Sequence, residues 1–225
     1  MRKSLVLVGL LTLFGFTSRA AEPAPDFKPR MTERGKLLFS DDLDKPFGKE
    51  WKVAKGKWEI VDGSMRGCEL KDDMHGAVSR HPVAFSSAVI QFSFKIDGAK
   101  ITSLSINGEK GHVCRVLLRP NGFTVQKDDQ DGKKGTDTAA PLDTCETPIK
   151  AGEWHTMLLE IHGKEMLATL DGKHTAYGEH AAVDKPKTNI GLTVGGESVS
   201  FKNLRVWEAT PNKEWATTKA TLKQK

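Results

Sequence analysis

Short stretches in which apolar and polar residues alternate fill the chain from residue 35 to residue 208, and none has the period of a helix. Parallel strands would need crossover helices, and no helical stretch lies between these runs. The sequence therefore predicts an all-β fold, an antiparallel two-sheet jelly-roll sandwich over residues 35–209. Glycine-containing pairs that suit tight turns separate the stretches: Asp62-Gly63, Asp97-Gly98, Asn107-Gly108, Asn121-Gly122, Asp171-Gly172 and Gly195-Gly196.

The N-terminal segment has the composition of a secretory signal peptide. Arg2 and Lys3 precede an apolar run over residues 5–16, and Ser18-Arg19-Ala20 offers small residues where a signal peptidase cleaves. The run is shorter than the ~20 residues of a membrane-spanning helix, so we do not expect the chain to span a membrane. We expect cleavage of residues 1–20 near Ala20 and export, which makes the protein secreted or periplasmic.

Linker-like segments flank the predicted strands. Residues 21–34 are rich in proline and charge, which favours a flexible leader. Residues 210–225 form a C-terminal tail that has the residues for a short helix. In that helix Thr210 would cap the N-terminus and Pro211 would take the first position.

The formal net charge of +5 does not indicate a nucleic-acid ligand. Removal of residues 1–20 takes away three basic residues and no acidic one, which leaves +2. No cluster of basic residues follows, and the chain has a single tyrosine. We therefore expect no nucleic-acid partner.

Three cysteines permit at most one disulfide within the chain and leave one thiol over. Cys68, Cys114 and Cys145 allow three pairings, and their spacing favours none of them. None lies near a second cysteine or a histidine at the spacing of a zinc site, so no metal site is assigned. The oligomeric state also stays open.

Alternation within the strands predicts a polar face on one sheet. In "AVIQFSFKI" the residues Ile90, Phe92 and Phe94 share an apolar side, and the polar residues point the other way. Two interpretations remain open: a solvated face, or the floor of a groove that hydrogen-bonds to sugar hydroxyls or a carboxylate. The groove would use Gln91, Lys95, Ser103, Ser105, Arg115 and Gln126 for binding, and Glu160 and His162 for catalysis.

Two loops add candidates. "YGEHAAVDKP" places Tyr177 and Glu179 where an aromatic ring beside a carboxylate suits the rim of a sugar site; the alternative is an ordinary connection. "KDDQDGKKGTD" groups carboxylates as calcium ligands are grouped, without the ligand order of an EF-hand. Calcium is thus the one cofactor that the sequence suggests, and a solvated hairpin tip is the alternative. The carboxylates belong to Asp128, Asp129, Asp131 and Asp137.

Four stretches carry a resemblance to a known family: "LLFSDDLDKPFGKEWKVAKG", "GKWEIVDGSMRG", "KAGEWHTMLLEIHGKEMLATLDGK" and "GGESVSFKNLRVWEA". Their order resembles the concanavalin A-like lectin and glucanase jelly rolls, and within these the secreted 3-keto-disaccharide hydrolase-like family. The resemblance implies a saccharide partner and a hydrolase or lyase activity. The chain departs from the family in lacking its Gly- and Tyr-containing stretch after the central strands. It also lacks the Glu-x-Asp-x-x-Glu signature of laminarinase-type enzymes.

The residues themselves leave the chemistry open between two classes. Hydrolysis of a glycosidic bond needs two carboxyl groups, and only Glu160 can be placed on the polar face. A lyase acting on a 3-keto sugar needs one base, Glu160 or His162, with Arg115 beside the carbonyl. The alternative is a non-catalytic, lectin-like module that binds glycans or a cell surface. Trp58, Trp154 and Trp207 are expected in the core or at sheet corners.

Overall fold

The computed structural model describes residues 25–130, 135 and 137–222; the expected signal peptide lies outside that part of the chain. The described part contains thirteen β-strands in antiparallel pairs and one α-helix. The elements are β1 (Thr32–Asp41), β2 (Lys52–Lys55), β3 (Lys57–Val61), β4 (Ser64–Cys68), β5 (Ala77–Phe85), β6 (Ala88–Asn107), β7 (His112–Arg119), β8 (Gly122–Lys127), β9 (Ala140–Glu146), β10 (His155–His162), β11 (Glu165–Leu170), β12 (His174–Glu179), β13 (Lys187–Pro211) and α1 (Trp215–Leu222), with 3-10 turns at Lys71–Asp73 and Ala181–Val183.

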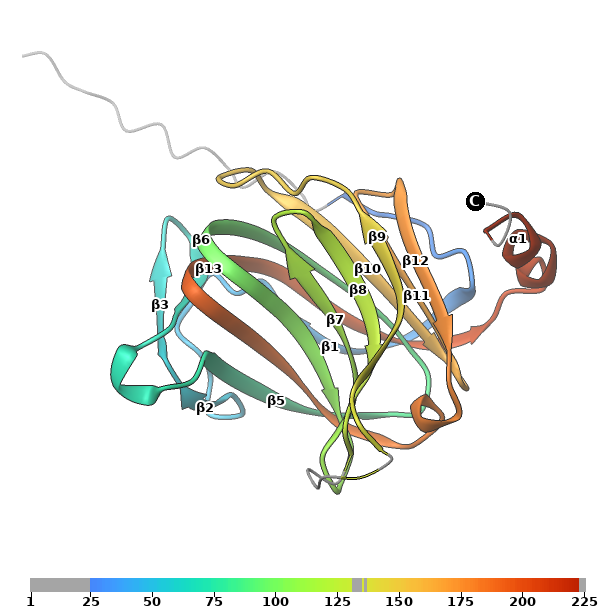
Figure 1. Ribbon diagram of the computed structural model, residues 1–225, viewed down its shortest axis with the longest axis horizontal. Helices are drawn as coiled ribbons and strands as arrows, with labels where there is room; N and C mark the ends of the chain where they lie inside the picture. The colour runs from blue at the N-terminus through green and yellow to red at the C-terminus, as the bar shows by residue number, and fades with distance from the viewer. Residues whose placement is uncertain (1–24, 131–134, 136, 223–225) are drawn as a thin grey trace, which may run out of the picture.

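Two long strands, β6 and β13, run side by side and hold the molecule together (Figure 1). Residues 88–98 of β6 pair with the C-terminal half of β13 and with β10. Residues 101–107 of β6 pair with the N-terminal half of β13 and with β7. The change of partner occurs at Gly98 and Gly196, whose positive φ angles of 78° and 101° favour glycine.

Both long strands continue past Gly98 and Gly196, so hydrogen bonds join all the strands into one sheet. That sheet folds over at these glycines into two layers. The first layer has the order β12-β11-β10-β6-β13, with β4 and β1 on the far side of β13 and β3 beyond β4. The second layer has the order β9-β8-β7-β6-β13-β5-β2. The predicted antiparallel jelly-roll sandwich is confirmed.

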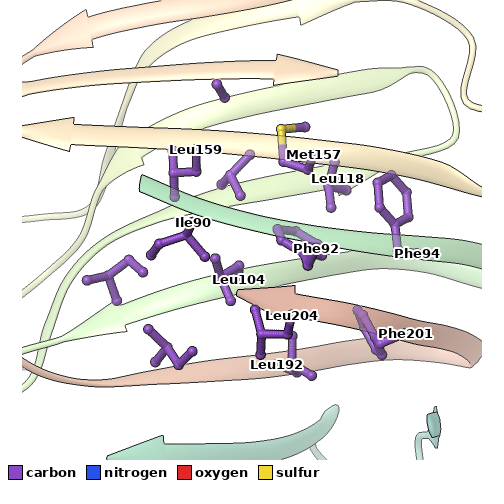
Figure 2. Packing of buried hydrophobic residues seen from close by; sticks show 14 of the residues in the cluster. Ile90, Phe92, Phe94, Leu104, Leu118, Met157, Leu159, Leu192, Phe201 and Leu204 are labelled. Atoms are coloured by element: carbon purple, nitrogen blue, oxygen red, sulfur yellow. The ribbon is translucent and has the colours of Figure 1, made fainter. Parts of the chain in front are cut away.

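The core between the layers follows the alternation read from the sequence. Phe92 and Phe94 of β6, Leu118 of β7 and Leu159 of β10 are fully buried, and Figure 2 shows them directed into the same space. Truncating one such phenylalanine to alanine costs about 3–5 kcal/mol, so this cluster supplies a large share of the stability. Cys114 lies in the same core, where burial raises the pKa of its thiol to about 12. Cys68 and Cys114 are both thiols.

The two ends of the described chain differ in detail from expectation. Strand β1 begins at Thr32, inside the segment expected to be a loose leader, because its first residues pair with the end of β13. The C-terminal helix exists, but it begins at Trp215, and Thr210 and Pro211 belong to β13. Asn212 starts the turn into the helix by accepting a hydrogen bond from the backbone of Glu214. Among the described residues, no helix has the length and apolar character to cross a bilayer.

The three tryptophans expected in the core do not behave alike. Trp58 stacks on Phe201 against the core, and Trp207 carries the guanidinium of Arg34 4.4 Å from its ring centre. Trp154 was expected in the core or at a sheet corner, and it is not in the core, because 38% of its surface is exposed. It is the last residue of the loop before β10, which begins at His155, and its ring lies at the surface.

Candidate functional site

The residues predicted to share one polar face lie on two faces that point in opposite directions. Alternation places Gln91 and Ser105 on the same side of β6, but β6 passes from one layer to the other between them. The outer face of the first layer carries Gln91, Lys95, Glu160, His162, Tyr177 and Glu179. The outer face of the second layer carries Ser103, Ser105, Arg115 and Gln126. The prediction of a single groove is therefore wrong.

On the first layer, Glu160 is fully buried and serves to hold the N-terminal segment. Its Oε1 accepts a hydrogen bond from the backbone N–H of Arg30 (3.0 Å), and its Oε2 accepts from those of Met31 (2.8 Å) and Thr32 (2.7 Å). The Thr32 hydroxyl donates a fourth bond, of 2.8 Å. Burial raises the pKa of Glu160 although these donors oppose the change. With both oxygens engaged and no access from solvent, Glu160 is not the catalytic base that the sequence suggested.

The same segment covers Gln91. The Gln91 amide donates to the carbonyl of Pro25 (3.0 Å) and accepts from the Arg34 guanidinium (3.1 Å). Lys95 lies to one side, 3.8 Å from Asp97 and 5.6 Å from the ring centre of Trp154. These contacts are internal to the fold, so neither side chain is presented to a ligand as predicted.

The predicted rim residues Tyr177 and Glu179 are occupied by the C-terminal helix. The Tyr177 hydroxyl lies 2.6 Å from Oε1 of Glu165, and the Lys219 ammonium of α1 contacts Glu165 (2.7 Å) and Glu179 (3.0 Å). Burial together with Glu165 raises the pKa of Tyr177, which keeps the phenol protonated. His162 ends β10 opposite Glu165 on this covered layer. These residues fasten α1 to β11 and β12.

On the second layer, six residues in register form a row across neighbouring strands, and we call it the basic row. Each residue is the direct partner of the next, so the five side chains belong to the outer face, and Gly191 lies in the same row. Three of them are cationic, and Gly191 together with the small side chain of Ser105 separates the two arginines. The row consists of Lys52, Arg80, Gly191, Ser105, Arg115 and Gln126.

Arg115 is held rigidly in this row. Its Nε donates to both oxygens of Asp128, at 2.8 and 2.7 Å, and Gln126 donates to the same carboxylate at 2.8 Å. Asp128 is 1% exposed, whereas the Arg115 side chain is 22% exposed. Since the carboxylate engages Nε, the terminal nitrogens of the guanidinium are left for another acceptor. The predicted ligand-facing position of Arg115 therefore remains a candidate, with Gln126 as its support.

His112 joins this face, although the sequence did not single it out for a site. Alternation from Arg115 would turn His112 toward the core, but a bulge at the end of the β6–β7 pair puts it opposite Asn107 instead. Its Nδ1 lies 2.5 Å from Oδ1 of Asn107, whose amide nitrogen donates to Asn189 at 2.7 Å. Only the bulge reveals this placement, and no residue pattern in the sequence marks it.

The chain of amides assigns the protonation of the His112 ring. Because Asn107 uses its nitrogen toward Asn189, its oxygen faces His112 and must accept, so Nδ1 carries the hydrogen and Nε2 keeps a free lone pair. Burial lowers the pKa of His112, and the charges of Arg115 and Arg80 lower it further against the opposing charges of Asp128 and Asp129. At neutral pH His112 is thus an uncharged base beside two guanidinium groups.

Two adjoining cavities open beside His112. The first, of about 300 Å³, is lined by Arg80, Asn189 and residues 107–112. The second, of about 410 Å³, shares Arg80 and Asn189 and extends to Lys52 and Pro82. A larger cavity of about 560 Å³ lies against the other side of residues 108–112. The neutral base His112, the cations of the basic row and the two adjoining cavities therefore all lie on the second layer.

The family model for the 3-keto-alpha-glucoside-1,2-lyase-like domain matches residues 36–207, well over half of the chain. The chain belongs to this family. No curated protein sequence matches it.

Solved structures with the same jelly-roll fold include binding modules and enzymes. The carbohydrate binding module CBM66 from Bacillus subtilis is 15% identical, with a TM-score of 0.59 over 71% of this chain and 96% of that one. The β-glucanase of Bacillus licheniformis is 9% identical, with a TM-score of 0.58 over 77% and 99%. The endo-β-galactosidase of Clostridium perfringens is 12% identical, with a TM-score of 0.61 over 85% and 66%. At these identities the likeness concerns the fold.

In this 3-keto-alpha-glucoside-1,2-lyase-like chain, the acidic loop expected to suit calcium is used differently. Asp128 binds Arg115 and Gln126, and Asp137 pairs with Lys127 at 2.7 Å. Asp131 lies outside the described residues. Within the described part of the chain, no three histidine, cysteine or acidic side chains are grouped as metal ligands.

The site combines one neutral base, His112, with the three cations of the basic row; of its described carboxylates, Asp128 binds Arg115, and Glu109 lines the cavity beside His112. Asp128, the buried acid of the site, is already neutralised by Arg115. Such a set can remove a proton from carbon and stabilise the negative charge that develops on a nearby oxygen. It does not supply the acid and nucleophile of a two-carboxylate glycosidase.

Proposed function

We propose that this protein is a carbohydrate-active enzyme that cleaves 3-keto-glucosides by elimination, with His112 as the base. The observation that carries the proposal is the His112–Asn107–Asn189 chain, which holds a neutral imidazole with Nε2 unprotonated at the mouth of a cavity. Membership of the 3-keto-alpha-glucoside-1,2-lyase-like family supports the substrate class. The N-terminal sequence supports action outside the cytoplasm, after removal of residues 1–20.

The chemistry follows from the ketone. A carbonyl at C3 makes the C2–H bond acidic, and Nε2 of His112 takes that proton while the electron pair moves onto the C3 oxygen. A free nitrogen of the Arg115 guanidinium stabilises this enolate. When the carbonyl reforms, a C1–C2 double bond appears and the C1–O bond breaks. The departing alkoxide takes the proton from His112, so the products are an unsaturated ketone and an alcohol.

Proton NMR of the full chain with 3-keto-disaccharides tests the proposal. We expect a new vinylic proton together with the signals of the released sugar. Replacing the base removes proton transfer, so His112→Gln should lower kcat by about 10²–10⁴-fold. His174→Gln is the matched control, because His174 is an exposed residue on β12 of the other layer.

Two results would count against elimination. Hydration of C1 without a vinylic product would make the protein a hydrolase. Sugar signals that broaden without any turnover would make it the lectin-like binding module that the sequence left open as an alternative.

A further inference from the structure

Lys52 and Arg80 lie directly opposite each other on the neighbouring strands β2 and β5. Side chains in such a pair project from the same face with Cβ atoms about 5 Å apart, and like charges in this position repel. Both side chains are exposed, and neither has an acidic partner among the described residues. The arrangement therefore raises the free energy of the unliganded protein.

The isolation of Arg80 is unusual within this chain. The other arginines of the described sheet faces and termini are engaged, with the exception of Arg119 at the β7–β8 turn. Arg66 reaches Glu59, Arg115 binds Asp128, and Arg30 donates to the carbonyl of Gly172. Arg34 and Arg205 pair with Asp26 and Asp42. Arg80 is thus an arginine of the candidate site whose guanidinium has no counter-charge.

The surroundings of Arg80 are shaped for a ligand. Its stem lies over Gly191, where an added Cβ would stand 3.3 Å from Cγ of Arg80 and 2.7 Å from the hydroxyl of Ser105. The cavity of about 410 Å³ that it lines with Lys52 has no acidic residue in its wall. The adjoining cavity is lined by two cations, Arg80 and Lys110, and one acid, Glu109, so its formal charge is +1 with His112 neutral.

We propose that the saccharide bound at this site carries a carboxylate, seated between Arg80 and Lys52. A planar guanidinium matches the two oxygens of a carboxylate, and an ammonium adds a second charge at low cost in geometry. Such an anion removes the repulsion between the two cations. Along the basic row Arg80 lies three strands from Arg115 and Lys52 lies four, at ~4.8 Å per strand, so a carboxylate between them is roughly 14 Å or more from Arg115. On the proposed function, the carboxylate therefore belongs to the part of the saccharide that lies farthest from Arg115.

This inference rests on the proposed function for the location of the reacting ring, but its test measures binding alone. Isothermal titration of the full chain would compare a disaccharide with a terminal glucuronate, its neutral glucose counterpart and the corresponding 6-sulfate. None carries a 3-keto group, so none turns over. We expect the glucuronate to bind about tenfold more tightly than the neutral sugar, with the difference shrinking as salt rises.

Variants locate the preference. Arg80→Gln should abolish the advantage of the glucuronate, and Lys52→Gln should reduce it. Arg119→Gln is the control: it also removes one positive charge, from an arginine at the far end of β7, and the variant should still bind the glucuronate more tightly than the neutral sugar. Equal affinity for the neutral and glucuronate sugars, or a preference that survives Arg80→Gln, would overturn the proposal. Tighter binding of the sulfate would overturn the assignment of a carboxylate.

The two proposals fail separately. If the protein prefers glucuronate through Arg80 but cleaves no 3-keto sugar, the lyase proposal is refuted and the proposal of an acidic ligand stands. If the protein cleaves neutral 3-keto-glucosides but shows no preference for glucuronate, the lyase proposal stands and the proposal of an acidic ligand is refuted. A wild-type protein that binds none of the sugars overturns the carboxylate seat.

Discussion

Nδ1 of His112 lies 2.5 Å from Oδ1 of Asn107, and this contact decides which ring nitrogen can act as a base. The two residues belong to different strands, β7 and β6, and meet only because the bulge shifts the register between them. Asn107 is in turn fixed by Asn189. A neutral amide, unlike a carboxylate, orients the imidazole without raising its pKa.

Replacing that amide by a carboxylate should therefore move the pH profile. In the wild-type protein burial lowers the pKa of His112 below 6.5, so the neutral base forms, and kcat/KM rises, at pH values below 6.5. In Asn107→Asp the new negative charge favours the imidazolium, which raises that pKa and shifts the acid limb to higher pH. The measurement is a pH–rate profile paired with NMR titration of the ring. An unmoved limb would remove His112 from the role of base.

Asp128 should control how Arg115 meets the substrate. In Asp128→Asn the charge-assisted bonds to Arg115 are weakened, so the guanidinium loses its fixed orientation, and we expect KM to rise by about tenfold. Urea unfolding should show a loss of about 1.5–3 kcal/mol. Asp42→Asn, which breaks an exposed pair with Arg205, is the control and should cost less than 1 kcal/mol. A stability loss with unchanged KM would show that Asp128 acts only in folding.

Gly191 should be intolerant of even a methyl group. In Gly191→Ala the new Cβ would stand 2.7 Å from the hydroxyl of Ser105, so that side chain must turn away from the Gly191 carbonyl to which it donates, or strand β13 or β6 must shift. We expect a destabilisation of about 1–3 kcal/mol by urea unfolding and weaker sugar binding. Adding Ser105→Ala removes the atom in conflict and should recover part of the stability. If the double variant is no more stable than the single one, the close approach is not the cause.

Glu160 should prove structural. Glu160→Gln turns an acceptor toward three backbone N–H groups into an amide that also brings donors, so we expect a loss of about 2–4 kcal/mol. Residues 25–31 should also become open to limited proteolysis. Glu153→Gln, at an exposed position, serves as the comparison. Intact resistance to protease in the variant would contradict the role of Glu160 in holding this segment.

The contact between α1 and the sheet should be lost in acid. The Lys219 hydrogen bond lowers the pKa of Glu179; hydrogen bonds from Lys219, Tyr177 and Trp215 also lower that of Glu165 against the opposing effect of burial. Because both carboxyl pKa values are lower in the folded state, their stabilisation is present above pH 4.5 and disappears as pH falls through the folded values. Trp215 fluorescence should report the release of α1. Lys219→Met should remove the transition; a transition that persists would have another origin.

The sequence was sufficient for the layers and the core because alternation acts locally. Phe92 and Phe94 were assigned to the interior from the alternation within their own strand, and both are fully buried. Alternation could not show that β6 changes layer near Gly98, so Gln91 and Ser105 were placed on a common face. The partners of Glu160 lie about 130 positions away, and nothing near Glu160 indicates them. His112 was missed because a bulge reverses the rule that the assignment used.

Both ends of the described chain are fastened to the first layer, through Glu160 at one end and through Glu165 and Glu179 at the other. The basic row lies on the opposite side of the sandwich. A tag, a fused domain or a solid support joined close to residue 25 or residue 222 would therefore lie on the side opposite the basic row. Protein immobilised through either of these two positions should therefore keep its ligand capacity.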